Sequence, residues 1–289
     1  MNYEQFKTML CPAILCREEV VGRHVCIEHV KEDVLCIWDE EDLNQKISLQ
    51  TQDLYELYLS RNMCSVVDEI VCRLRLVQFF EAYSPIIRPM NYEMNQELLQ
   101  DTIYQKIDDI TLALYTVMYD NNGCLAAEKI CRSAAQIWGV SAEKLLEETI
   151  ISAGRIRPPR LYHRDDIERM SCLEGGVFMP GERGKRIEIH NHDAEEGIRG
   201  YRLTVQGYTN GASALFYPGV QERLATLLEG DYYVGFISVN EVVIHPARNK
   251  VLGEMRQAVR RANVMRPEKE RLTEHIYRYC SNGKGLVQV

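Results

Sequence analysis

The side chains best suited to metal chemistry lie in the segment RIEIHNHDAEEGIRG, residues 186–200. His190 and His192 are two residues apart, and on a β-strand such residues point to the same face. With a carboxylate from Asp193 or Glu195 they would form the ligand set of many metal-dependent hydrolases. The spacing therefore raises the hypothesis of a hydrolase with a metal ion at His190, His192 and Asp193.

The surroundings of this cluster favour a second interpretation, a hydrophilic connection. Gly184, Gly197 and Gly200 flank it, and the remaining histidines (His24, His29, His163, His245 and His275) lie in no supporting motif. A catalytic metal needs a further ligand and neighbouring groups that orient the imidazoles. We therefore predict no metal, no cofactor and no catalytic residue here, and the hydrolase remains the main alternative.

A second candidate is the basic stretch ARNKVLGEMRQAVRRANVMRPEKER, with a helix expected at 249–264. Arg256 and Arg260 would share the outer face of this helix, with Arg261 beside them, and an apolar stripe would line the opposite face. One interpretation is phosphate contact with DNA or RNA. No aromatic residues interleave to stack on bases. We favour a solvated face on a helix that docks onto a sheet, and nucleic-acid binding remains a second alternative.

Composition and charge narrow the classes of protein. The chain has 289 residues, of which 46% are hydrophobic and 26% charged, values ordinary for a globular protein. A net charge of −8 argues against a general partner of nucleic acids or anionic membranes, because both are polyanions. The ten cysteines are scattered and form no C-x-x-C pair, which indicates free thiols in a reducing compartment. No segment has the length of a membrane span or the pattern of a signal peptide, so we expect a cytoplasmic protein without a membrane partner.

Hydrophobic periodicity predicts the elements that must position these residues. The N-terminal part should hold a short helix at 3–10, a hairpin within 20–39, a short strand at 46–49 and a helix at 63–82. Ser84-Pro85 should end that helix, and a short helix should follow at 92–99. Further on, we expect helices at 132–138, 141–152 and 218–229, two strands within 232–247 and a last strand at 274–280.

Two Asn-Gly pairs lie in similar contexts. Asn122-Gly123 and Asn210-Gly211 each follow a β-rich run and precede an amphipathic helix. Because Asn-Gly favours a tight hairpin turn, we expect two hairpin–helix units, whether or not they form a true repeat. The predicted fold is α+β, with mixed, mainly antiparallel sheets. Its parts are an N-terminal hairpin-plus-helix unit at 1–84, a first hairpin–helix unit at 85–152, a linker at 153–200 that is rich in proline and glycine, and a C-terminal α+β unit at 201–289.

Several stretches carry a resemblance to a known family. They are TNGASALFYPGVQERLATLLEGDYYVGFISVNEVVIHPA, the basic helix with EHIYRY after it, RPMNYEMNQELLQD and IWGVSAEKLLEET. Over roughly residues 45–289 the chain resembles the uncharacterised bacterial family catalogued as domain of unknown function 5688. More distantly, its order of elements is similar to domain of unknown function 1444.

The resemblance implies no activity and no catalytic motif, but members of the family can lie near mobile genetic elements. This genomic association, and no property of the residues, implies a role in phage conflict or regulation. Since the residues offer no convergent catalytic constellation and no cofactor fingerprint, we predict a non-enzymatic protein that binds another macromolecule, a protein above all. The identity of that partner and the oligomeric state are beyond the sequence.

Overall fold

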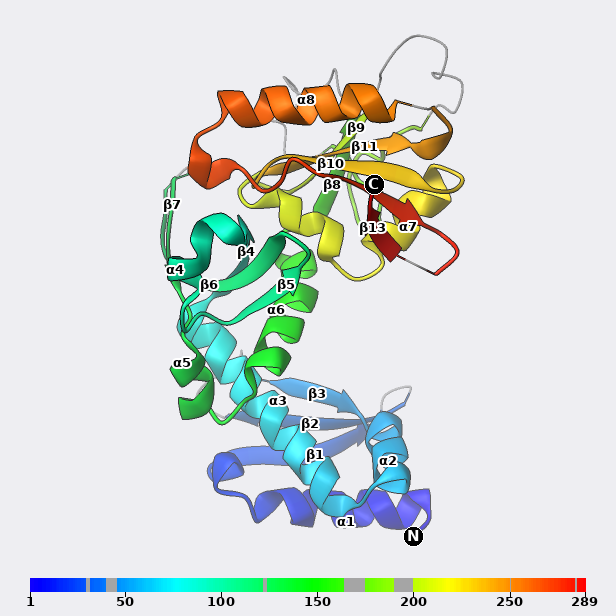
Figure 1. The fold of residues 1–289 in the computed structure, drawn as a ribbon. Coiled ribbons are helices and arrows are strands. Elements are labelled where there is room, and N and C mark those ends of the chain that lie inside the picture. The colour runs from blue at the N-terminus through cyan, green and yellow to red at the C-terminus, as the bar shows by residue number, and fades with distance from the viewer. Residues whose placement is uncertain are drawn as a thin grey trace. The chain divides into compact units, whose positions relative to one another are not determined.

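The computed structural model confirms the predicted α+β class, with every strand pair antiparallel among the named strands (Figure 1). It describes residues 1–29, 32–39, 46–121, 124–163, 175–189, 200–249, 251–283 and 285–289. These fall into two compact units: unit 1 holds Met1–Ser84 with Ala134–Ser141, and unit 2 holds Pro85–Ser133 with Ala142–Val289.

Unit 1 is a three-stranded antiparallel sheet packed against helices. Its sheet has the order β1-β2-β3, and its first three helices are α1, α2 and α3. Their bounds are α1 Tyr3–Leu15, β1 Arg23–His29, β2 Asp33–Asp39, β3 Ile47–Gln50, α2 Thr51–Ser60 and α3 Met63–Tyr83. The hairpin, the third strand and the long helix thus form where periodicity predicted them.

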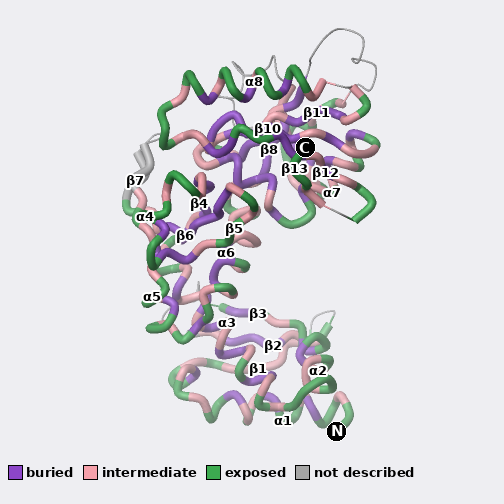
Figure 2. Tube along the Cα trace, in the orientation of Figure 1, coloured by how far each residue is buried: buried purple, intermediate pink, exposed green. Residues whose placement is uncertain are grey.

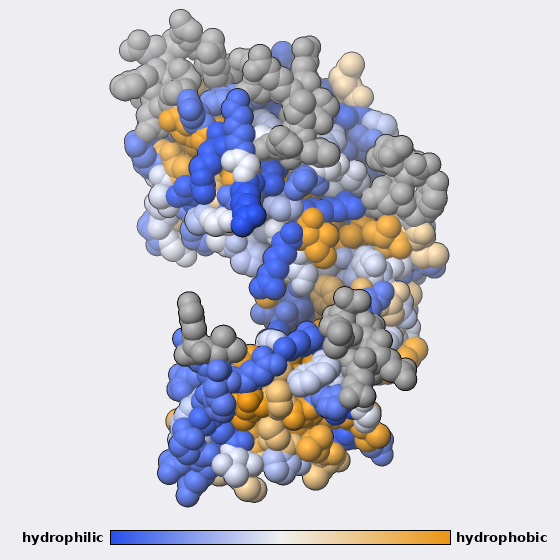
Figure 3. Space-filling view, turned by 180° about the vertical axis from the view of Figure 1, so that it is seen from behind, coloured by the Kyte–Doolittle hydropathy of each residue, from blue (hydrophilic) through white to orange (hydrophobic). Residues whose placement is uncertain are grey.

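The core of unit 1 follows from this periodicity. Phe6, Leu10 and Ile14 recur along one face of α1 and are fully buried, and they pack with Leu35 and Ile37 of β2 and with the apolar face of α3. A capping box between Asn2 and Gln5 begins α1. Hydrophobic side chains also gather at the centre of the unit 1 face seen in Figure 3.

Helix α3 ends where the sequence signals it. Ser84 caps it in the left-handed conformation, with a φ of 43°, and Pro85 cannot continue the helix. The chain then enters strand β4 (Pro85–Asn91), an element that the sequence analysis did not predict.

Unit 2 holds two antiparallel sheets. The four-stranded sheet consists of β4, β5 (Tyr104–Ile107), β6 (Ile110–Asn121) and β7 (Cys124–Lys129). The short helix α4 (Gln96–Leu99) lies between β4 and β5 in the chain, within the predicted helix at 92–99. The hairpin predicted around Asn122-Gly123 is present, because Asn121 pairs with Cys124; the two turn residues lie outside the described residues.

The larger sheet of unit 2 has six strands in the order β13-β12-β10-β11-β9-β8. Figure 2 shows buried residues along its central strands, and its largest apolar cluster packs around Tyr232, Phe236 and Leu203. The bounds are β8 Pro159–His163, β9 Tyr201–Val205, β10 Tyr232–Ser238, β11 Glu241–Pro246, β12 Ile276–Cys280 and β13 Gly285–Gln288. The associated helices are α6 Ala142–Ile156, α7 Val220–Leu227 and α8 Leu252–Met265, while α5 (Arg132–Ile137) spans the boundary between the unit assignments.

Two expectations differ from the structure. The proposed linker at 153–200 holds strand β8, which pairs with β9 over five residue pairs. The segment after Asn210-Gly211 is not the second strand of a hairpin but a 3-10 helix, Gly211–Phe216. Its backbone bonds to the β10–β11 turn instead, with the Ala212 N–H donating to the Val239 carbonyl at 3.1 Å. Tertiary hydrogen bonds therefore override the local turn signal.

An ion cluster ties α1 to the sheet of unit 1 and gives its stability a defined pH dependence. Lys7 Nζ and His29 Nδ1 each lie 2.5 Å from a carboxylate oxygen of Asp33. The hydrogen bond from Lys7, with a second from His29, lowers the pKa of Asp33 from its ordinary 3.8 to about 2. A lowered carboxyl pKa adds stability that is present above the unfolded-state value and lost as the pH falls through the folded-state value.

We therefore expect Asp33→Asn to destabilise unit 1 at neutral pH, and the difference from the parent protein to shrink between about pH 4 and pH 2. Both tryptophans, Trp38 and Trp138, lie in unit 1, so urea titrations followed by tryptophan fluorescence report this unit. A difference between the two proteins that stays constant down to pH 2 would contradict the expectation.

Candidate protein-binding groove

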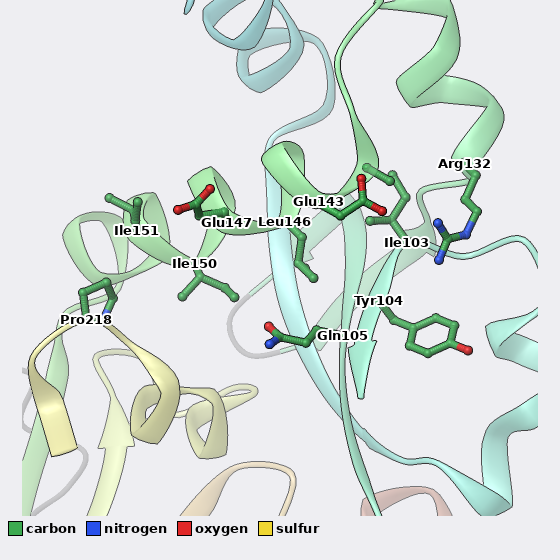
Figure 4. Close-up of a pocket in the computed structure, with 11 residues that line it drawn as sticks. Ile103, Tyr104, Gln105, Arg132, Glu143, Leu146, Glu147, Ile150, Ile151 and Pro218 are labelled. Carbon is green, nitrogen blue, oxygen red and sulfur yellow. The ribbon is translucent and has the colours of Figure 1, made fainter. Parts of the chain in front are cut away.

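A pocket with a volume of about 540 Å³ lies within unit 2, between helix α6 and strand β5 (Figure 4). We call it the α6–β5 groove. Its lining residues are Ile103, Tyr104, Gln105, Arg132, Ala142, Glu143, Leu146, Glu147, Ile150, Ile151 and Pro218. Six of these eleven residues are aliphatic, and the other five carry polar or charged groups.

Helix α6 forms one wall because of its strongly amphipathic sequence. Leu145, Leu146 and Thr149 are buried, and the Thr149 hydroxyl is satisfied by the Leu145 carbonyl at 2.7 Å. Glu143 and Glu147, four residues apart, are exposed on the neighbouring face. Side chains at this spacing lie one helical turn apart on the same side of a helix.

Strand β5 forms the other wall and leaves one edge open. Strand β4 pairs with one edge of β6. Along the other edge, β5 pairs with the first part of β6 and β7 with the later part. Among the described strands, β5 pairs with β6 alone. Ile103 directs both its N–H and its carbonyl toward this sheet. Successive residues of an antiparallel strand direct their N–H and carbonyl groups to alternate edges, so Tyr104 and Lys106 direct these groups away from β6.

The groove carries excess negative charge along α6. Lys144 and Glu148 pair with each other on the adjacent face, at 3.3 Å. Neither Glu143 nor Glu147 forms an ion pair within the described part of the chain. In Figure 4, Arg132 lies at the Glu143 end, Pro218 lies beyond Ile150 at the other end, and Gln105 points into the space between α6 and β5. Two like charges one turn apart repel each other, so a cation placed between them would be stabilised.

The structure does not test the metal site that the sequence analysis kept as an alternative. His190, His192 and Asp193 lie outside the described residues. Within the described ranges, no three histidine, cysteine or acidic side chains are grouped in a way that could hold a metal ion.

The basic residues lie on the outer face of α8. Arg256, Arg260 and Arg261 are exposed, while Met255 and Val259 on the opposite face are buried against the six-stranded sheet. The helix therefore docks by its apolar stripe, and its arginines face solvent. Figure 1 shows α8 lying along strands β9, β10 and β11.

The groove residues were absent from the sequence-based candidates. The helix that carries Glu143 and Glu147 was predicted, but its facing strand was not, since β5 is only four residues long. The one available signal was the pair of glutamates beside Leu146, Ile150 and Ile151, and alone it is typical of any amphipathic surface helix.

These observations define an α+β protein of two compact units with an open, partly apolar and acidic groove in unit 2. The chain belongs to the Family of unknown function (DUF5688), whose model matches residues 27–281. The more distant similarity to domain of unknown function 1444 stays a prediction. No curated protein and no solved structure matches the chain. None of the helices in the described ranges combines the length and hydrophobicity that a membrane crossing requires.

Proposed function

We propose that this protein binds a partner protein in the α6–β5 groove, and that the bound segment is an extended strand with apolar and basic side chains. The observation that carries the proposal is the open edge of β5 directly beside a pocket of about 540 Å³. An exposed strand edge is a template for an added strand, and a neighbouring pocket selects alternate side chains of the guest.

The backbone of β5 supports this mode of binding. The outward N–H and carbonyl groups of Tyr104 and Lys106 would pair with the guest strand. Because β5 is short, it offers few backbone hydrogen bonds, and the pocket must supply most of the affinity. Leu146, Ile150 and Ile151 offer an apolar wall for guest side chains that face α6.

The acidic face of α6 supports a basic guest. Glu143 and Glu147 line the pocket, and a lysine or arginine held between them would relieve their mutual repulsion. The lining includes no histidine, cysteine, serine or threonine, so it lacks the hydroxyl or thiol nucleophile and the imidazole base of the common covalent mechanisms. This composition favours a binding role over covalent catalysis. The scattered cysteines favour the cytoplasm as its place of action.

A designed peptide tests the proposal. Thr-Val-Thr-Lys-Thr-Val-Thr, acetylated and amidated, places valine and lysine on one face when it is extended. We expect it to bind the full chain saturably in isothermal titration calorimetry, and the same peptide with glutamate in place of lysine to bind at least about tenfold more weakly, a difference of roughly 1.4 kcal/mol.

Variants locate the site. The double variant Glu143→Lys/Glu147→Lys should weaken binding of the lysine peptide by about tenfold or more, because it turns attraction into repulsion. Glu254→Lys, an exposed substitution on α8, is the matched control and should leave the affinity unchanged. Equal affinity of the two peptides, or equal weakening by both variants, would contradict the proposal.

A further inference from the structure

A second, smaller cavity lies between α8 and the sheet face that α8 covers. Its volume is about 130 Å³, and its walls are formed by strands β9, β10 and β11 and by the inner face of α8. We call it the α8 cavity. The lining residues are Arg202, Ile237, Val243, His245, Met255, Ala258, Val259 and Ala262. The cavity is therefore apolar except for two residues, Arg202 and His245.

His245 is held rigidly at one wall. It is 2% exposed and lies on β11, opposite Tyr233 of β10. Its ring packs directly on the backbone of Gly200, where an added Cβ would lie 2.3 Å from His245 Nε2. The imidazole therefore has little freedom to turn away from the cavity.

Arg202 is held through a terminal nitrogen of its guanidinium group and not through Nε. One terminal nitrogen donates to Glu241 at 2.6 Å, and Glu241 is also 3.4 Å from Arg266, which in turn lies 3.5 Å from Glu270. The Arg202 Nε–H is shielded from solvent and has no hydrogen-bond partner among the residues that the structure describes. A buried donor without an acceptor is costly, so a ligand that accepts from it gains binding free energy.

We propose that the α8 cavity binds a small monocarboxylate with a short aliphatic chain. The carboxylate accepts from Arg202 Nε–H beside the polar ring of His245, and the chain contacts Met255, Val259 and Ile237. Because a water molecule occupies roughly 30 Å³ of liquid, the cavity has room for about four waters or one acid of a few carbons. The apolar walls favour such an acid over inorganic phosphate, whose oxygens would lose hydration without replacement.

Titration of the full chain with butyrate, butyramide and inorganic phosphate tests the ligand class, with binding followed by calorimetry. We expect butyrate to bind saturably in the millimolar range, and butyramide and phosphate to bind at least about tenfold more weakly. No saturable butyrate binding below about 50 mM would overturn the proposal. Equal binding of butyramide would overturn the role of charge, and equal binding of phosphate would overturn the choice of a monocarboxylate.

Variants test the location. Ala258→Leu places a larger side chain in the cavity and should weaken butyrate binding at least about tenfold. Gln257→Leu adds bulk to the exposed face of the same helix turn and should leave binding unchanged. Arg202→Lys keeps a cation for Glu241 but removes the Nε–H, and should weaken butyrate binding without unfolding the chain, as checked by circular dichroism. Unchanged affinity in Ala258→Leu and Arg202→Lys would place the bound acid elsewhere and overturn the proposal.

Discussion

Replacing Gly211 with alanine should lower the free energy of unfolding of unit 2 by about 3 kcal/mol. The α-carbon of Gly211 packs against the β10–β11 turn, and an added Cβ would lie 2.0 Å from Thr204 Oγ1 and 2.3 Å from the Asn240 carbonyl oxygen. The second contact is with backbone, so it cannot be relieved by a rotamer change. Chemical denaturation followed by circular dichroism measures the loss.

Gly253 provides the matched control for this substitution. It lies in the first turn of α8, is exposed, and an added Cβ would meet no atom within 4 Å. Alanine there should stabilise the protein by about 0.5 kcal/mol, because it restricts the unfolded chain and favours the helix. If both glycine variants shifted the unfolding midpoint in the same direction and by a similar amount, the packing described at Gly211 would be wrong.

Removing the carboxylate of Glu241 should also cost about 3 kcal/mol. This side chain is 3% exposed and lies between Arg202 and Arg266, at 2.6 and 3.4 Å. Glu241→Ala would leave Arg202, which is only 17% exposed, without its counter-charge. Breaking a buried pair on one side is costly because the remaining charge has lost its compensation. Urea unfolding measures the change.

One companion variant separates the charge from the shape at this position, and a second serves as an exposed control. Glu241→Gln keeps a hydrogen-bond acceptor for Arg202 and should cost less than Glu241→Ala. Glu229→Ala removes a carboxylate that is 63% exposed and 3.9 Å from Arg248, so it should change stability by less than about 0.5 kcal/mol. A Glu241→Ala variant as stable as Glu229→Ala would show that the cluster contributes nothing to folding.

The elements that the sequence predicted well are those whose burial follows a simple local pattern. Phe6 and Leu10 on α1 recur at helical spacing among exposed or partly exposed residues, and Leu35, Cys36 and Ile37 form a short buried apolar run on β2. Their partners lie nearby in the chain, so local pattern and tertiary contact agree. Local pattern and tertiary contact also agree for β10 and β11, because these two strands pair with each other and are joined by a short turn.

The elements that the sequence did not predict depend on distant partners. Strand β4 contains Pro85 and Pro89, which cannot donate to a ladder, and it is stabilised by pairing with β6. Strand β8 lies in a segment rich in proline and glycine and forms only because β9, some forty residues on, supplies the partner. The α6–β5 groove also depends on elements that are distant from each other in the chain. Its walls, α6 and β5, are separated in the chain and meet only in the folded unit.

Amide hydrogen exchange at β5 tests the proposed function most directly. Because the N–H groups of Tyr104 and Lys106 face outward from the sheet edge, they should exchange quickly in the free protein. Saturation with the lysine peptide should slow both amides by about tenfold or more, since a guest strand would bond to them. It should leave the amides of the exposed β13 strand unchanged. Binding of the peptide with no protection at Tyr104 and Lys106, or with protection at another strand edge, would contradict strand addition in the α6–β5 groove.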